Sequence, residues 1–122
     1  MIQLITFDQA LNLRNHIREH GGFTYDPRND EFFTGQGFAV SVKGNERIIS
    51  GIPFAVDFVA YSIMHSEILN MADHYLGGWL YEGNTYLDIS IVLSDFDIAV
   101  HTAREHGEIA VYDLGNNEEY KV

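Results

Sequence analysis

Two similar segments constrain the fold of this chain more than any other feature of its sequence. Residues 18–33 and 104–120 share Arg-Glu-His-Gly, then Tyr-Asp, Asn and Glu, with one extra residue in the second copy. In each copy a helix that ends at glycine is followed by two extended segments joined by a polar turn. The repeat predicts an internal duplication of a helix–strand–turn–strand unit. Its shared residues are therefore interpreted as structural rather than catalytic.

The rest of the pattern predicts a single α+β domain with about three helices and antiparallel β-hairpins. At 122 residues and 46% hydrophobic side chains, the chain can bury a core, and no Pro/Ser-rich linker divides it. Thr6 and Ser94 are expected to cap the first and last helices. We expect helices over residues 7–20, 53–75 and 95–106, a short strand over 1–5, and hairpin turns at 27–30, 43–46, 83–84 and 114–117.

The clearest hairpin is expected around Gly83-Asn84, a two-residue turn signal. It would pair Trp79 with Asp88 and Tyr81 with Tyr86, and place these four side chains on one sheet face with Ser90. A tryptophan and two tyrosines beside a carboxylate match the composition of a protein-binding hot spot. The alternative is that the long 53–75 helix covers this face, which would make the aromatic residues part of the core.

The charge of the chain is strongly negative and unevenly distributed. Eighteen acidic residues against seven basic ones give a net charge of −11. Residues 1–61 carry seven acidic and five basic side chains, whereas residues 62–122 carry eleven acidic and two basic ones. Such a field repels phosphate backbones, so we expect no direct binding of nucleic acid, and it attracts basic protein surfaces. The alternative is that the acidity serves solubility alone.

Composition also bears on the compartment. The chain has no Cys, which excludes disulfides, Cys-ligated zinc and thiol catalysis and fits a reducing compartment. No apolar run is long enough to cross a bilayer, and residues 1–6 lack the basic region and long apolar stretch of a signal peptide. We therefore expect a cytoplasmic protein without a membrane segment.

One motif resembles a catalytic centre. His16-Ile17-Arg18-Glu19-His20 matches His-x-x-Glu-His, in which two imidazoles four residues apart face a zinc ion and the Glu acts as general base. The helix is expected to end at Gly21, the second copy of the repeat does not keep the spacing, and no third ligand stands out. We interpret these histidines as structural and expect neither a metal nor a cofactor.

Other catalytic patterns are weaker still. No Gly-x-Ser-x-Gly elbow supports a Ser-His-Asp triad, and Gly35-x-Gly37 lacks the helix and basic residue of a phosphate loop. Asp95 and Asp97 lie two residues apart, so they do not face each other on a helix. They are interpreted as charges at the helix start, where the dipole favours them. The sequence thus predicts a protein that is not an enzyme.

A resemblance adds a biological setting. The stretch Gly78-Trp79-Leu80-Tyr81-Glu82-Gly83-Asn84-Thr85-Tyr86-Leu87-Asp88, with Ile109-Ala110-Val111-Tyr112-Asp113, resembles a segment of small proteins of phages, plasmids and other mobile elements. Gly22-Phe23-Thr24-Tyr25-Asp26-Pro27 resembles them in the first half. The resemblance implies no catalytic residues. It implies a setting in which small acidic proteins bind host factors, and some, such as anti-restriction and anti-CRISPR proteins, present carboxylates to host nucleases in place of phosphates.

The sequence as a whole therefore predicts a non-enzymatic acidic binding protein of a mobile element. Its expected partner is a basic host protein such as a nucleic-acid-binding enzyme, and in the sharpest form a defence nuclease whose groove it occupies. The alternatives are an accessory interaction module with another target and, less favoured, a small metal hydrolase built on His16, Glu19 and His20. The residues expected to bind the partner are Trp79, Tyr81, Tyr86, Asp88, Asp95, Asp97, Glu105 and Glu108.

Overall fold

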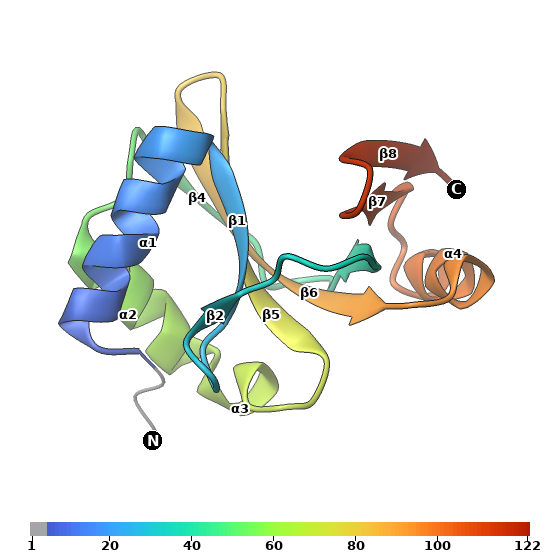
Figure 1. Cartoon of the computed structure of the whole chain (residues 1–122), viewed down its shortest axis with the longest axis horizontal. Coiled ribbons are helices and arrows are strands. Elements are labelled where there is room, and N and C mark those ends of the chain that lie inside the picture. Colours follow the sequence, from blue (N-terminus) through green and yellow to red (C-terminus); the bar gives the residue numbers. More distant parts are fainter. Residues whose placement is uncertain (1–4) are drawn as a thin grey trace.

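The computed structural model describes residues 5–122, which form four helices and one antiparallel sheet of eight strands (Figure 1). The helices are α1 (Phe7–His20), α2 (Ala55–Met64), α3 (Ser66–Leu69) and α4 (Phe96–Glu105). The strands are β1 (Gly22–Asp26), β2 (Glu31–Phe32), β3 (Phe38–Ser41), β4 (Arg47–Ser50), β5 (His74–Tyr81), β6 (Asn84–Leu93), β7 (Ala110–Asp113) and β8 (Glu118–Lys121). The predicted α+β class is confirmed. The strand expected over residues 1–5 lies outside the described residues except for Ile5, which is buried in the core.

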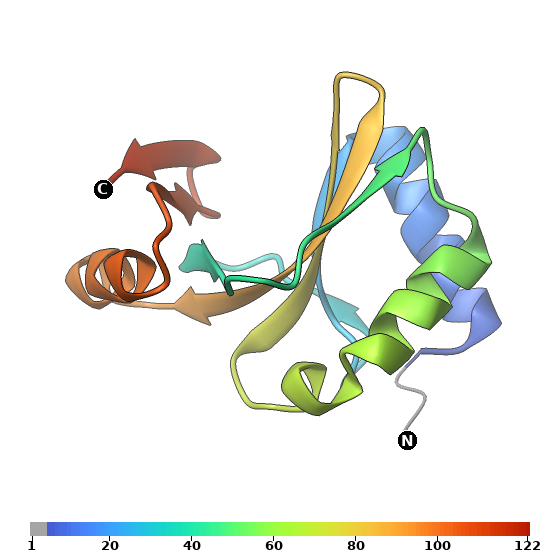
Figure 2. The same ribbon diagram turned by 180° about the vertical axis from the view of Figure 1, so that it is seen from behind.

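The sheet runs in the order β2-β1-β5-β6-β3-β7-β8, and β4 also pairs with β6. The long strand β6 joins two bodies, one with α1 and α2 and the other with α4, β7 and β8; both bodies are visible from either side (Figures 1 and 2). Within residues 5–122 no helix is both long and apolar enough to span a bilayer.

The predicted repeat is confirmed in structure, because both Arg-Glu-His-Gly segments end a helix. Helix α1 starts at a Thr6–Gln9 capping box, as predicted, and ends at Gly21, which takes the left-handed conformation at φ 78°. Helix α4 ends just before Gly107, which has φ 71°. Each helix leads into a hairpin, β1–β2 after α1 and β7–β8 after α4. Glycine is suited to both helix ends because it has no Cβ to clash in this conformation.

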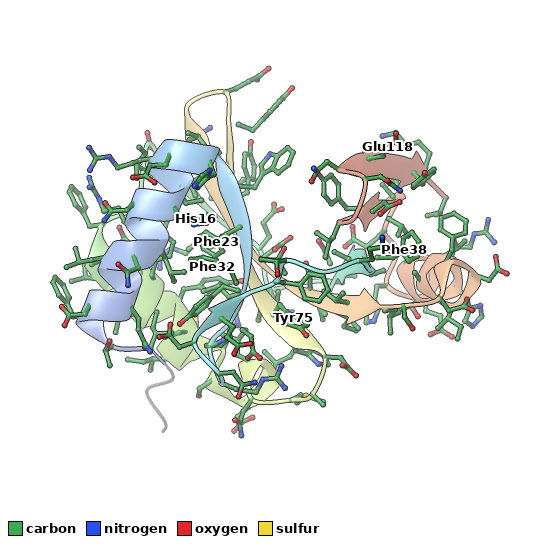
Figure 3. All side chains as sticks on the ribbon, viewed as in Figure 1. His16, Phe23, Phe32, Phe38, Tyr75 and Glu118 are labelled. Carbon is green, nitrogen blue, oxygen red and sulfur yellow. The ribbon has the colours of Figure 1, made fainter. Side chains whose placement is uncertain are left out.

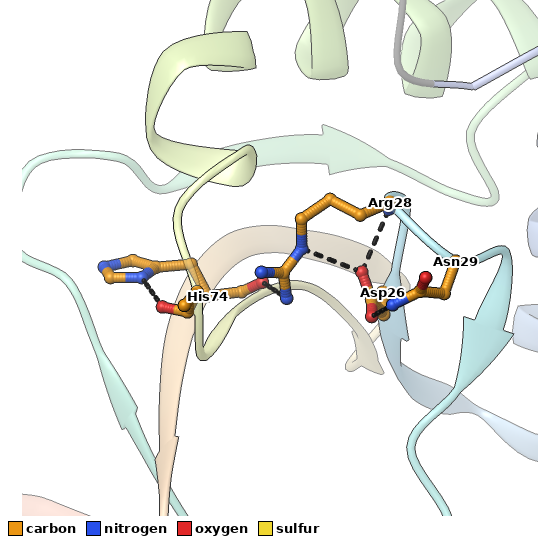
Figure 4. A network of polar contacts seen from close by, with 5 residues as sticks. Asp26, Arg28, Asn29 and His74 are labelled. Carbon is orange, nitrogen blue, oxygen red and sulfur yellow. Dashed lines mark hydrogen bonds and ion pairs between the residues drawn. The ribbon is translucent and has the colours of Figure 1, made fainter.

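The turns of the two hairpins are also built alike. Asp26 accepts hydrogen bonds from the Arg28 backbone N–H at 2.9 Å and from the Asn29 side chain at 2.8 Å (Figure 4). Asp113 accepts the equivalent bonds, from the backbone two residues on and from the side chain of Asn116. In both turns the aspartate replaces backbone partners that the turning chain cannot supply. The shared Asp and Asn therefore have a structural role, as the repeat predicts.

Alternation along the strands separates a covered face from an open one. Leu87 and Ile89 of β6 point toward α1 and α2 and join a core that includes Leu13, Ile17 and Phe58. Further along the same face, α4 packs its Ala99 and Ala103 against residues of β3 and β7, Val40 and Val111. All three longer helices thus cover one face of the sheet. The opposite face carries the alternate side chains of β5 and β6, and no helix of residues 5–122 lies over it.

The prediction of one helix over 53–75 is wrong. Helix α2 ends at Met64, a single turn follows as α3, and Asp73 takes a left-handed conformation at φ 63° before β5 begins. The apolar and aromatic residues after Asp73 pair with β6 over eight residues. The hydrogen bonds of this long strand pair outweigh the preference for a helix that the spacing of the apolar side chains indicates. Gly77 and Gly78, just beyond the expected end of that helix, lie in the middle of β5.

Three further details differ from the predictions. The turn of the β5–β6 hairpin is Glu82-Gly83, both with positive φ, so Trp79 pairs with Tyr86 instead of Asp88 and each predicted partner is shifted by two residues. Because two residues are one full period of a strand, the side chains keep their predicted faces. Strands β3 and β4 form no hairpin but lie end to end along β6. Asp95, not Ser94, caps α4, by accepting from the Ile98 N–H at 2.9 Å.

Gly78 provides a test of the packing between β5 and α1. A Cβ there would lie 2.7 Å from the ring of Phe23, which is held by the rings of Phe32 and Phe58 and cannot withdraw. Gly78→Ala should lower the free energy of unfolding by about 1–3 kcal/mol, measured by chemical denaturation. Gly35→Ala, whose Cβ would make an ordinary contact at 3.6 Å, should change it by less than about 0.5 kcal/mol. Equal effects of the two variants would contradict this packing.

Asp26 provides a test of the β1–β2 turn through pH. Burial acts to raise the pKa of Asp26, but hydrogen bonds from Asn29 and Arg28 and the guanidinium charge outweigh it and hold the pKa below the usual value. A carboxyl with a lowered folded pKa stabilises the fold above its unfolded pKa, about 3.9, and this contribution is lost as pH falls through the folded pKa.

Asp26→Asn should therefore cost about 1–2 kcal/mol at neutral pH and much less in acid, where the wild-type carboxyl is protonated. The measurement is the free energy of unfolding from neutral pH to about pH 3. Glu67→Gln, which removes one exposed charge from α3, is the control and should leave the pH dependence nearly unchanged. A cost that is the same at every pH would show that the charge of Asp26 does not hold the turn.

Candidate functional site

The open face of the sheet contains a cleft of about 650 Å³, within the range of ligand sites in proteins. It lies over the middle of β5 and β6 and is bounded by α1 and β1 on one side and by β7 and β8 on the other. The side chains that shape it come mainly from five strands: Thr24, Ser41, Trp79, Tyr86, Asp88 and Tyr112. We call this site the cleft.

Aromatic side chains form the walls of the cleft. The rings of Trp79 and Tyr112 meet edge to face with centroids 6.3 Å apart, although β5 and β7 are three strands apart in the sheet. Three strand spacings amount to about 14 Å, so the contact requires long side chains and a sheet that curves toward its open face. Trp79 and Tyr81 are 50% and 52% exposed, and Tyr86 is partly exposed. The alternative, that a helix covers these residues, is wrong.

Asp88 lies at the floor of the cleft, in the stretch where β6 changes its neighbour from β4 to β3. It faces Gly77 of β5 so closely that a Cβ on that residue would meet its Oδ1 at 2.0 Å. Its Oδ2 accepts a hydrogen bond from the Ser41 hydroxyl at 2.8 Å. Within residues 5–122 no hydrogen bond joins Oδ1, and every fully buried side-chain polar atom there has a partner. Oδ1 is therefore unpaired but not fully buried, and Asp88 is one of the residues that line the cleft.

The environment of Asp88 disfavours its charge. Burial raises the pKa of this carboxyl, the hydrogen bond from Ser41 acts in the opposite direction, and the negative charges of Glu46 and Glu108 raise the pKa further. Glu46 and Glu119 also line the cleft, whereas no Lys or Arg of the described residues 5–122 does. The cleft therefore presents a desolvated carboxylate inside an electronegative, aromatic surface, which suits a cation.

The structure divides the predicted partner-binding residues into two groups. Trp79, Tyr81, Tyr86 and Asp88 all line the cleft. The other four, Asp95, Asp97, Glu105 and Glu108, belong to α4 and the segment after it and do not line the cleft. They have other local roles as well, since Asp95 caps α4 and Glu105 lies 2.9 Å from His101.

Sequence reasoning missed several residues of the cleft, including Thr24, Ser41, Glu46 and Tyr112. Ser41, Glu46 and Tyr112 reach it only through the pairing of β3 with β6 and β7, which joins residues more than forty positions apart. No local pattern marks the first two. Tyr112 was visible in the repeat, where it was interpreted as structural because the first copy has Tyr25 at the same place.

The His-x-x-Glu-His motif lies beside the cleft. His16 stacks on Phe32 at 4.1 Å between centroids, and the His20 ring is 4.5 Å away (Figure 3). Burial and the charge of His20 lower the pKa of His16, while Glu19 acts in the opposite direction. Within residues 5–122 no three His, Cys, Asp or Glu side chains are grouped to hold a metal ion. The contacts of His16 are those of a packed aromatic residue.

This packing leads to a prediction on metal content. Protein prepared without chelator or affinity tag should contain well under one equivalent of zinc, because structural zinc sites use four ligands and catalytic ones three protein ligands. His16→Ala should leave the metal content unchanged and lower stability by about 1 kcal/mol through the lost stacking on Phe32. One equivalent of zinc that disappears in His16→Ala would instead establish a metal site.

Three observations thus define the site: exposed aromatic walls, a floor carboxylate with one unpaired oxygen, and a lining that, within residues 5–122, has no basic side chains other than the histidines of α1. Exposed aromatic side chains beside a carboxylate are common at protein-binding surfaces. Comparison with protein-family models, curated proteins and solved structures finds no match to this chain.

Proposed function

We propose that this protein is a non-enzymatic binding protein whose partner is a basic protein of the cytoplasm. The observation that carries the proposal is the cleft, in which Trp79, Tyr86 and Asp88 are open on a sheet face that no helix covers. Exposed aromatic side chains around a partly desolvated pocket are the usual centre of a protein interface. A carboxylate at the floor of that pocket selects a positively charged partner.

The charge of the whole chain supports the same partner. The net charge of −11 comes mostly from the second half of the chain, which contributes α4 and β8 as well as β5 and β6. Asp97 and Glu105 are exposed on α4, which belongs to the same body as β7 and β8 (Figure 1). A field of this sign accelerates encounter with a basic surface, whereas the aromatic anchors determine how long the complex lasts.

In its most specific form, we propose that the partner is a nucleic-acid-binding enzyme of a host, such as a defence nuclease inhibited by a phage or plasmid protein. Enzymes of this class present basic grooves to phosphates, and exposed carboxylates match the charge of those phosphates. The resemblance of residues 78–88 and 109–113 to small proteins of mobile elements favours this setting. An interaction module with another basic target is the remaining form of the same proposal.

The experiment measures how association depends on salt and on the position of charge. Immobilised protein first captures partners from a bacterial lysate, and each identified partner is then purified and its association rate measured at low and high salt. We expect the rate to fall steeply with salt, because a Debye length of about 8 Å at physiological ionic strength screens exposed charges. Competitor DNA or RNA should displace the protein if a nucleic-acid groove is the target.

A matched pair of charge-reversal variants shows which acidic residues accelerate association. Reversal of Asp97, Glu105 and Glu108 to Lys should slow association about tenfold or more, within the range over which steering changes such rates. Reversal of Glu19, Glu31 and Glu67 changes the net charge equally and should have a smaller effect. Asp95 is left unchanged because it caps α4. An acidic partner would overturn the proposal, and so would an association rate that changes neither with salt nor in either variant. If the partner is basic but nucleic acid does not displace the protein from it, only the proposal of a nuclease target is excluded.

A further inference from the structure

We propose that the cleft is an arginine pocket, in which Asp88 binds the guanidinium group of one partner side chain beside the aromatic residues Trp79, Tyr86 and Tyr112. This inference rests on the proposed function and adds the contact that gives it specificity. Nothing in the sequence pattern alone assigns it, because Tyr112 and Ser41 join the cleft only in the folded sheet.

The first step concerns the carboxylate. Asp88 is held by a single hydrogen bond from Ser41, and among the described residues 5–122 its Oδ1 has no hydrogen-bond partner. Burial of a charge with so few partners is unfavourable, as the raised pKa of this carboxyl also indicates. The fold nevertheless makes room for it, since only glycine at position 77 leaves space for Oδ1. A cation that enters the cleft would restore the missing charge-assisted hydrogen bond.

The second step concerns the walls. Three aromatic residues from β5, β6 and β7 line the same cleft as Asp88, and the Trp79 and Tyr112 rings are in edge-to-face contact. A guanidinium is planar, weakly hydrated and able to stack on such rings while it donates hydrogen bonds at its edge. A lysine ammonium is compact and strongly hydrated, so it loses more on entering a partly desolvated site. The walls therefore favour arginine over lysine.

The third step concerns the remaining donors of the guanidinium. It carries five N–H groups, of which one carboxylate oxygen satisfies one or two. The hydroxyls of Thr24 and Ser90 line the same cleft and offer further acceptors, and Glu46 stands at its rim. The volume of about 650 Å³ exceeds that of one side chain, so the cleft also accommodates the chain on either side of the arginine.

The test uses a capped Gly-Arg-Gly tripeptide, with its citrulline and lysine counterparts as controls. Trp79 is the single tryptophan of the chain, so its fluorescence reports on the cleft directly, and calorimetry gives the affinity. We expect the arginine peptide to bind, the lysine peptide to bind more weakly, and the neutral citrulline peptide to bind at least tenfold more weakly. Equal binding of all three peptides, or no binding of the arginine peptide, would overturn the inference.

The decisive variant is Asp88→Asn, which keeps the shape of the side chain and an acceptor for the Ser41 hydroxyl. It should weaken binding of the arginine peptide about 10- to 100-fold, the effect of a lost charge-assisted hydrogen bond. It should also raise the Tm at neutral pH by a few degrees, because it removes a desolvated charge. Asp97→Asn, an exposed residue outside the cleft, should change neither quantity.

A lower Tm in Asp88→Asn with unchanged peptide binding would make Asp88 a purely structural residue and overturn the inference. If that variant fails to fold, Trp79→Ala takes its place, read by calorimetry, and unchanged binding of the arginine peptide would then overturn it. The two proposals remain separable. A basic partner captured with salt-dependent association while the tripeptide fails to bind would remove the arginine pocket alone, whereas tripeptide binding without any basic partner would remove the proposed function alone.

Discussion

Strand β6 is the element on which the rest of the structure depends. It pairs with β5 along one edge and with β4 and then β3 along the other, so it joins both bodies of the molecule. Its alternate residues face opposite sides of the sheet, one side being the core and the other the cleft. Leu87 and Ile89 are fully buried under the helices, while Tyr86 and Asp88 face the cleft. A slip of one residue against β5 would exchange these two sets, and so the core that α1 and α2 cover also fixes which side chains the cleft receives.

The parts of the fold that sequence reasoning predicted correctly are those with local signals. Thr6 with Gln9 starts α1, Gly21 ends it, and the paired Tyr-Asp turns form hairpins, all within a few residues of their signal. The errors lie where local and long-range preferences compete. Residues 74–81 carry apolar and aromatic side chains that fit a helix or a strand, and only the eight-residue ladder with β6 decides between them. The failed hairpin at 43–46 has the same cause, because β3 and β4 both pair with β6 instead of with each other.

The same distinction applies to the candidate site. Trp79, Tyr81, Tyr86 and Asp88 were predicted to share a face because alternation is a local rule, and the predicted face is kept because the register is shifted by two residues, one full period of a strand. The remaining parts of the cleft come from β1, β3 and β7 and depend on tertiary pairing. The sequence also could not predict that the cleft is exposed, because this exposure depends on where α2 ends and on which sheet face the helices cover.

The repeat explains how one motif contributes to both the core and the cleft. Between the glycine that ends the helix and the Tyr-Asp pair, the second copy has one residue more than the first. In an extended strand one residue reverses the side that a side chain faces. Tyr25 of the first copy is accordingly buried among Phe23 and Phe32, whereas Tyr112 of the second points into the cleft and meets Trp79. Val111 takes the core position in its place. The one extra residue of the second copy thus places its tyrosine in the wall of the cleft, and this is why identical residues in the two copies do not have identical roles.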